Sequence, residues 1–122
     1  MKNLFVFLIL FASSCFEEPK KDIFEGQNLS YEQKGKVLYN KHCLSCHGPQ
    51  AKGTGMAPFK LFDQEIVSDE LAFAKLLKNG REGTMMKSFE DVLTEEYMYY
   101  VRDYLLSLRN EIIPTPIPSS HQ

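Results

Sequence analysis

Residues 43–47 read Cys43-Leu44-Ser45-Cys46-His47, a C-x-x-C-H motif. On a short helical turn, residues three apart lie on the same side, so both thiols can bond to one edge of a haem. The imidazole that follows directly is then placed beneath the iron as an axial ligand. The motif therefore predicts one covalently attached c-type haem on Cys43 and Cys46, with His47 as the proximal ligand of its iron.

Three other interpretations of the two cysteines are weaker. A structural zinc site needs about four ligands, usually from two Cys/His pairs, and the chain has one further cysteine, Cys15. A redox C-x-x-C opens a helix after a buried strand, whereas this motif closes a helix-like stretch. A disulfide between residues three apart forms a strained ring and leaves His47 unexplained. Haem attachment is therefore favoured over zinc, redox and disulfide sites.

The N-terminus has the pattern of an export signal. A basic start is followed by an apolar run over residues 4–12 and two serines before Cys15. This run is too short to span a bilayer core, which takes about twenty residues. We therefore predict a signal peptide over residues 1–14.

The residues before Cys15 resemble the lipobox of bacterial lipoproteins, in which cleavage leaves a lipidated cysteine at the N-terminus. Ala12 stands where the lipobox usually has leucine, so an ordinary signal peptide is the alternative. Because Cys43 and Cys46 are committed to haem, Cys15 has no thiol partner in an oxidising compartment. We therefore expect lipid on Cys15 and a periplasmic, membrane-anchored protein.

The remaining chain divides into three parts. Residues 15–29 are rich in charge and turn formers, which predicts a lipidated N-terminus and flexible tether. Residues 111–122 carry prolines at alternate positions, which predicts a disordered tail. Between them, residues 30–110 form one domain of about 80 residues, marginal at burying enough apolar surface alone. A large apolar cofactor would complete its core.

Three helices are predicted in this domain. Ser30 and Gln33 form a capping box for the first helix, which runs towards His42. The second follows Ser68, has acidic residues in its first turn, and ends before Gly80. Its expected buried face consists of Leu71, Phe73, Ala74, Leu76 and Leu77.

The third helix follows Thr94 as its N-cap, with two glutamates in the first turn. An apolar stripe recurs along it at helical spacing. The stripe consists of Tyr97, Val101, Tyr104, Leu105 and Leu108. No alternating run supports a sheet, so the fold class predicted is all-α, with three main helices and loops around one haem.

A sixth iron ligand is most often a methionine thioether. Met98 lies inside the third helix and is better interpreted as core or helix surface. Met56 is only nine residues past His47, so the chain between them is short for reaching the opposite haem face. Met85 and Met86 lie in the loop between the second and third helices, which can cross to the distal side.

Residues 30–109 resemble the class I cytochrome c family in its short bacterial version. Gly35, ahead of the motif, matches the glycine that lets the family's last helix cross the first closely. Residues 53–58, GTGMAP, look like the loop in which the proline carbonyl accepts a hydrogen bond from the proximal histidine. The resemblance therefore implies that the carbonyl of Pro58 orients His47.

Residues 80–89, GREGTMMKSF, are similar to the family's Gly-Arg-x-Gly-Thr-x-Met-Pro-x-Phe. In that register Met86 is the distal iron ligand and Met85 occupies the preceding position. Lys87 stands where proline is usual, so Met85 stays open as the alternative ligand. Arg81 is a candidate partner for the haem propionates.

Lys52 and Lys60 are further candidates for propionate contacts, and solvated surface cations are the alternative interpretation of all three basic residues. Residues 30–110 contain eleven Lys/Arg and eleven Asp/Glu, so the protein part of the domain is formally neutral and no strong steering field is indicated. Nothing in this pattern supports nucleic-acid binding.

The resemblance implies an electron carrier, with no enzyme activity of its own, that shuttles one electron between extracytoplasmic redox partners. Because protein fills both axial positions, no small-molecule substrate is expected. The expected partners are redox proteins of a respiratory or oxidoreductase complex. Alternatives are a haem-based ligand sensor, or a haem subunit or module of a larger oxidoreductase.

Overall fold

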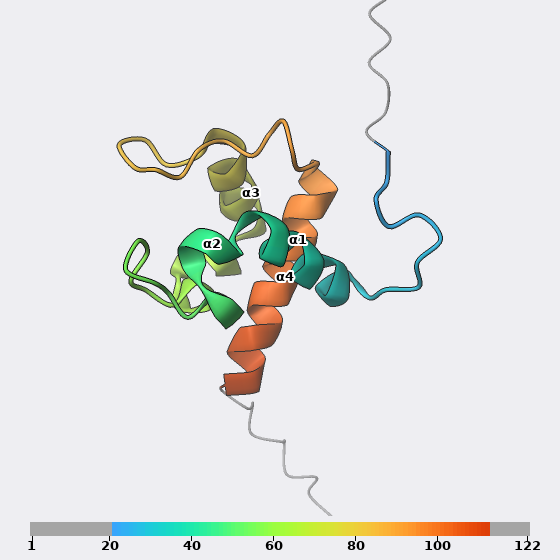
Figure 1. Ribbon diagram of the computed structural model, residues 1–122, viewed down its shortest axis with the longest axis horizontal. Helices are drawn as coiled ribbons and strands as arrows, with labels where there is room; N and C mark the ends of the chain where they lie inside the picture. Colours follow the sequence, from blue (N-terminus) through green and yellow to red (C-terminus); the bar gives the residue numbers. More distant parts are fainter. Residues whose placement is uncertain (1–20, 113–122) are drawn as a thin grey trace, which may run out of the picture.

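The computed structural model describes residues 21–112, which fold as α-helices joined by loops and short 3-10 turns (Figure 1). The predicted signal peptide, the lipid site at Cys15 and nearly all of the proline-rich tail lie outside the described residues. Within the described range, no helix is long and apolar enough to cross a membrane. The same range contains no β-strand, which confirms the all-α prediction.

Helix α1 comprises Tyr31–His42 and is followed by the short helix α2, Leu44–His47. The predicted capping box is present: the Ser30 hydroxyl accepts from the Gln33 N–H at 3.2 Å. In return the Gln33 side chain accepts from the Ser30 N–H at 2.9 Å. The haem-binding motif therefore lies at the junction of the two helices, with Cys43 between them.

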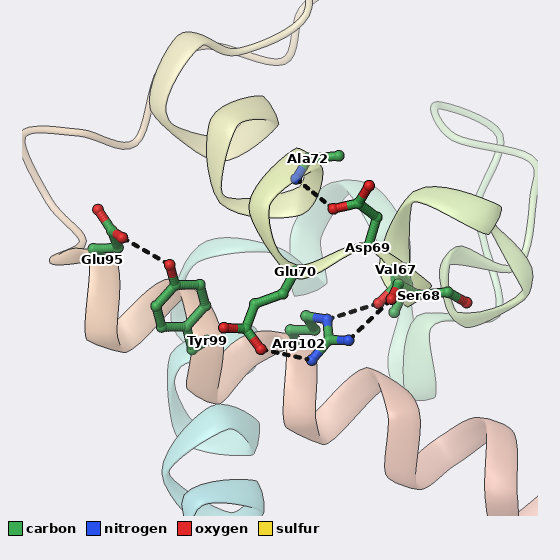
Figure 2. Close-up of polar contacts among 8 residues, drawn as sticks. All are labelled: Val67, Ser68, Asp69, Glu70, Ala72, Glu95, Tyr99 and Arg102. Carbon is green, nitrogen blue, oxygen red and sulfur yellow. Dashed lines mark hydrogen bonds and ion pairs between the residues drawn. The ribbon is translucent and has the colours of Figure 1, made fainter.

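Helix α3, Glu70–Asn79, begins one residue later than predicted. Ser68 ends a 3-10 turn, and the Asp69 carboxylate caps α3 by accepting from the Ala72 N–H at 3.0 Å (Figure 2). The expected apolar face is also narrower, because Leu71 points to solvent. Three members of that face are buried: Phe73, Ala74 and Leu77.

Helix α4 comprises Glu95–Ile112. The Thr94 hydroxyl accepts from the Tyr97 N–H at 3.2 Å, which confirms its role as the N-cap. All five members of the predicted stripe are buried, and Met98 is fully buried beside them. The sequence therefore placed this helix and its packing face correctly.

Helices α1 and α4 cross in close contact (Figure 1). A Cβ atom built on Gly35 would lie 1.8 Å from the Tyr100 carbonyl oxygen, so only glycine fits at the crossing. One turn further along, the rings of Tyr39 and Tyr104 pack with their centroids 5.4 Å apart. This confirms the close crossing that the family resemblance implied.

Three 3-10 turns were not predicted: η1 (Pro49–Ala51), η2 (Leu61–Asp63) and η3 (Glu65–Ser68). Two arginines of α4, seven residues apart and therefore on one face, hold η2 and η3. Arg102 Nε donates to the Val67 carbonyl at 2.8 Å (Figure 2). Arg109 Nε donates to the Phe62 carbonyl at 2.7 Å.

Arg109→Met should destabilise the protein by about 2 kcal/mol, because hydrogen bonds from a charged donor to buried carbonyls contribute about 1.5–3 kcal/mol. Arg109 also donates to the Gln64 carbonyl and the Ser68 hydroxyl, so methionine leaves several acceptors unpaired. Urea unfolding monitored by circular dichroism measures the loss. The exposed Lys75→Met variant is the matched control and should keep wild-type stability; equal losses in both variants would contradict the role of Arg109.

The described part of the expected flexible tether is packed against the domain. Phe24 is 4% exposed, and its ring meets that of Tyr97 edge-on at 5.5 Å. The Ile23 N–H donates to the Tyr97 hydroxyl at 2.9 Å. Residues 22–24 of the predicted tether therefore pack against the domain in this structure, because burying Phe24 offsets the entropy of ordering them.

Candidate functional site

A cavity of about 350 Å³ lies between α2, α3 and the two loops that follow them. Its size falls in the range of about 300–1,000 Å³ typical of cofactor sites. Most of the wall surface is apolar, and aliphatic and phenyl side chains contribute to it. These residues include Leu61, Ile66, Phe73, Leu76, Leu77, Phe89 and Val101.

The three functional side chains of the C-x-x-C-H motif all line this cavity. Cys43 is buried and Cys46 is half-buried, and both are free thiols. Burial, with a smaller effect of Cys46, raises the pKa of the Cys43 thiol to about 12. A thiolate is therefore disfavoured at this wall, whereas an uncharged thioether suits it.

The imidazole of His47 lies against the ring of Phe59, with the centroids 5.9 Å apart. Burial lowers the pKa of His47, which favours the neutral form that binds metals. Its Nδ1 is buried, and no residue of the described range accepts a hydrogen bond from it. The hydrogen bond that the Pro58 carbonyl is expected to accept from His47 is therefore not formed in this structure, and the Phe59 ring lies edge-on to the imidazole instead.

Two hydroxyl groups hold the backbone around the motif. The buried Tyr39 hydroxyl donates to the Gly48 carbonyl at 2.6 Å. The Thr54 hydroxyl donates to the Cys46 carbonyl, also at 2.6 Å. Both contacts fix backbone next to residues of the motif. Neither was predicted, because a hydrogen bond to a distant carbonyl leaves no periodic signal in the sequence.

Three methionines line the cavity: Met56, Met85 and Met86. Met86 is half-buried and packs against the hydrophobic core. Met85 is 78% exposed and Met56 is 59% exposed. Met98 is absent from the cavity lining, as its interpretation as core residue requires.

The backbone of Met86 is fixed on both sides. Its N–H donates to the Thr84 hydroxyl at 3.2 Å, and its carbonyl accepts from the Arg81 N–H at 2.9 Å. The Thr84 hydroxyl in turn donates to the Arg81 carbonyl at 2.7 Å. The loop is thus closed on itself by hydrogen bonds directly before the position where the family usually has proline.

The same loop is fastened to the end of α3. The Phe89 N–H donates to the Leu77 carbonyl at 2.8 Å, and the Ser88 hydroxyl donates to the Lys78 carbonyl. Gly80 has φ +69°, and a Cβ there would lie 2.6 Å from the carbonyl carbon of Lys87. The glycine therefore lets the two ends of the loop pass each other closely.

Among the three basic candidates, only Arg81 lines the cavity; Lys52 and Lys60 are exposed outside its lining. Several lining residues were not predicted from the sequence, and one of them is a histidine. His42 directly precedes the motif, and its ring meets Phe89 edge-on at 6.4 Å. Burial, aided by Lys41, lowers the pKa of His42. Its place next to Cys43 was the signal that could have identified it.

Comparison with known proteins decides the family. The family model described as cytochrome c oxidase, cbb3-type, subunit III matches residues 31–105. The chain belongs to this family of class I c-type cytochromes. Membership implies a covalently bound haem c with its iron. The two thiols, the imidazole and the thioether on one apolar cavity fit that group.

Two cytochromes c are close in sequence to this cytochrome. Cytochrome c550 of Pseudomonas aeruginosa is 35% identical over 78 residues, which cover 61% of this chain and 53% of that one. Cytochrome c-554(547) of Halothiobacillus neapolitanus is 36% identical over 85 residues, covering 62% of this chain and 93% of that one. These relatives are electron carriers rather than enzymes.

Two further matches are a much longer protein and a solved structure of low sequence identity. Subunit CcoP of the cbb3-type oxidase of Azospirillum sp. is 28% identical over 81 residues, which cover 57% of this chain and 27% of CcoP. This cytochrome thus spans about half of cytochrome c550 and about a quarter of CcoP. The crystal structure of cytochrome CL from Methylophaga aminisulfidivorans aligns with a TM-score of 0.58 at 14% identity, covering 88% of this chain and 90% of that one. The structural match supports the cytochrome c fold.

Proposed function

We propose that this cytochrome carries one electron at a time between extracytoplasmic redox proteins. Cys43 and Cys46 would hold the haem covalently, and His47 and Met86 would supply the protein ligands of its iron. The observation that carries the proposal is that all four side chains line one mostly apolar cavity. With both axial positions filled by protein, no substrate is needed at the metal.

The bound haem supplies the one-electron couple of its iron. The chain's own residues tune that couple. The soft thioether of Met86 favours the reduced state and raises the reduction potential relative to a second histidine. Apolar walls such as Phe73 and Leu77 exclude water and disfavour the extra charge of the oxidised state. His47, kept neutral by burial, is in the form that coordinates.

Met86 is preferred over Met85 as the distal ligand because of burial and backbone restraint. Met86 packs against the core and is fixed by Thr84 and Arg81, whereas most of the Met85 side chain faces solvent. Arg81 lines the cavity and is the basic residue best placed to pair with a haem propionate. A charged guanidinium and a carboxylate form strong hydrogen bonds.

For location, we propose that the protein is exported and held at a membrane by lipid on Cys15. The apolar run that precedes two serines and Cys15 supports this, as does the lack of a thiol partner once Cys43 and Cys46 hold haem. A covalently attached c-type haem is also expected in the periplasm.

A second candidate is a haem module within a terminal oxidase assembly. The similarity to part of CcoP favours this alternative. Purification distinguishes the two roles. A free carrier isolates as a single cytochrome that can be reduced and then oxidised again by a membrane oxidase. A module would instead copurify with the other subunits of an oxidase.

The proposed role as an electron carrier is tested on the purified holoprotein. Acid–organic extraction should leave the haem colour on the polypeptide, and the pyridine haemochrome spectrum should be that of a c-type haem. The ferrous protein should resist carbon monoxide, because Met86 already fills the sixth position. Extractable haem or bound zinc would refute covalent attachment, and ready binding of carbon monoxide would favour a ligand sensor.

A further inference from the structure

The N-terminal end of the described chain is clamped to α4 by one tyrosine. The Tyr97 hydroxyl donates to the Asp22 carboxylate at 2.7 Å and accepts from the Ile23 N–H at 2.9 Å. The same Asp22 oxygen accepts from the Phe24 N–H at 2.9 Å, and Phe24 is buried against the Tyr97 ring. We call Asp22, Ile23, Phe24 and Tyr97 the clamp.

An aromatic cluster surrounds the clamp. The Lys34 ammonium lies 5.6 Å from the Phe24 ring, 5.9 Å from the Tyr31 ring and 5.1 Å from the Tyr100 ring. Tyr31 stacks on Tyr100 with the centroids 5.0 Å apart. Tyr31 is nonetheless 63% exposed, and Ile23 is 48% exposed. Apolar surface is therefore exposed, next to a half-buried cation, beside the point where the chain enters the domain.

The clamp shortens the chain between the proposed lipid and the domain. Counted from Cys15 to Asp22, a fully extended chain spans roughly 25 Å. A chain free as far as Ser30 would span about 50 Å. The shorter length is comparable to the diameter of a small domain, so a domain held by it has little room to turn over at a membrane surface.

The N-terminal segment that carries the clamp and the two loops that border the cavity extend to opposite sides of the α1/α4 crossing. In Figure 1 the N-terminal segment, in blue, approaches α1 from one side. The loop after α2 and the loop between α3 and α4 extend to the other side. Those two loops supply the cavity-lining residues Met56, Phe59, Met85 and Met86.

We propose that the clamp holds the aromatic cluster against the lipid surface that carries the anchor, so that the haem cavity faces away from the membrane. The inference rests on the proposed lipid at Cys15. Tyrosine rings favour the interface between lipid and water, and a lysine beside them suits anionic headgroups. Asp22, Glu32 and Glu96 lie in the same region, so the short tether and apolar contact, rather than net charge, supply the orientation.

The test uses the full-length lipidated holoprotein in vesicles of phosphatidylethanolamine and phosphatidylglycerol that carry a headgroup fluorophore. Haem quenches the fluorophore when it comes near. Tyr97→Phe with Asp22→Ala should open the clamp and raise quenching per bound protein, because the freed chain is long enough to let the domain turn its haem side towards the lipid. Hydrogen exchange in the peptide over residues 21–29 should rise in the same variant.

Tyr99→Phe is the matched control, because that hydroxyl bonds to Glu95, at the first turn of α4 rather than to the clamp. It should leave both measurements at wild-type values. Faster exchange at residues 21–29 with unchanged quenching would overturn the orientation. A holoprotein that fails to float with vesicles would overturn the anchor and the orientation together, while its haem spectrum and redox cycling would still support electron transfer.

Discussion

Replacing Cys43 and Cys46 together by serine should give a protein that lacks haem and shows no cooperative thermal unfolding. The two thiols are the predicted covalent attachments, so their loss removes the group that fills the cavity. The remaining polypeptide would have to fold around a mostly apolar space of about 350 Å³. A chain of this size has little stability to spare.

The magnitude supports this expectation. In the haem-free chain the apolar wall that the cofactor would cover stays in contact with water, and apolar surface that is not buried forgoes about 25 cal/mol per Å². The net stability of a folded domain is about 5–15 kcal/mol. The loss of apolar burial against the haem therefore draws on a small reserve of stability, and the haem-free chain should populate loosely packed states.

Differential scanning calorimetry and near-ultraviolet circular dichroism measure the effect. The matched control is Ser45→Ala, which keeps both thiols and changes the exposed residue between them. This control should bind haem and melt at the wild-type temperature. A cooperative transition of the double serine variant near that temperature would show that the protein core is complete without the cofactor.

Local signals account for the helices that the sequence placed correctly. The capping box at Ser30 and the N-cap at Thr94 each depend on residues within one turn, and each predicted helix start agrees with the structure. The start of α3 was displaced by one residue because Ser68 and Asp69 are both good caps. The adjoining turn η3, held by Arg102, takes up Ser68 and leaves the cap to Asp69.

The features of the fold that could not be predicted from the sequence depend on contacts between residues far apart in the chain. Arg109 reaches the Phe62 carbonyl across 47 residues, and Tyr97 reaches Asp22 across 75 residues. Such contacts depend on how helices pack, and the residue types involved are common on any helix. The same reason explains the packed segment at Phe24, whose charged and polar neighbours resemble those of a linker. The thiols and imidazole were predictable because one local motif contains them all.

Replacing the proposed distal ligand is the strongest remaining test of the haem site. Met86→Ala should abolish the weak far-red methionine–iron charge-transfer band and open the ferrous protein to carbon monoxide. It should also lower the reduction potential by on the order of a hundred millivolts, within the range of about 0.8 V that axial ligands set. The reason is that the soft thioether, which favours reduced iron, is lost. Absorption spectroscopy and redox potentiometry provide the measurements.

Met85→Ala is the matched control, because it removes an identical side chain one residue away that is 78% exposed. The charge-transfer band, the reduction potential and the resistance to carbon monoxide should all stay close to their wild-type values. The neighbouring thioether could still replace Met86 if the loop slides by one residue, and Lys87 removes the proline that would stiffen the chain there. The bonds from Met86 to Thr84 and Arg81 oppose that slip.

A variant with both Met85 and Met86 replaced by alanine separates the loss of the Met86 ligand from its replacement by Met85. If Met85 substitutes after a slip, the Met86 variant keeps a weakened band that disappears when both methionines are alanine. Loss of the band in the Met85 variant alone would reverse the assignment. A band that survives in the double variant would exclude both residues and direct attention to Met56, which also lines the cavity and lies on the loop that follows the motif.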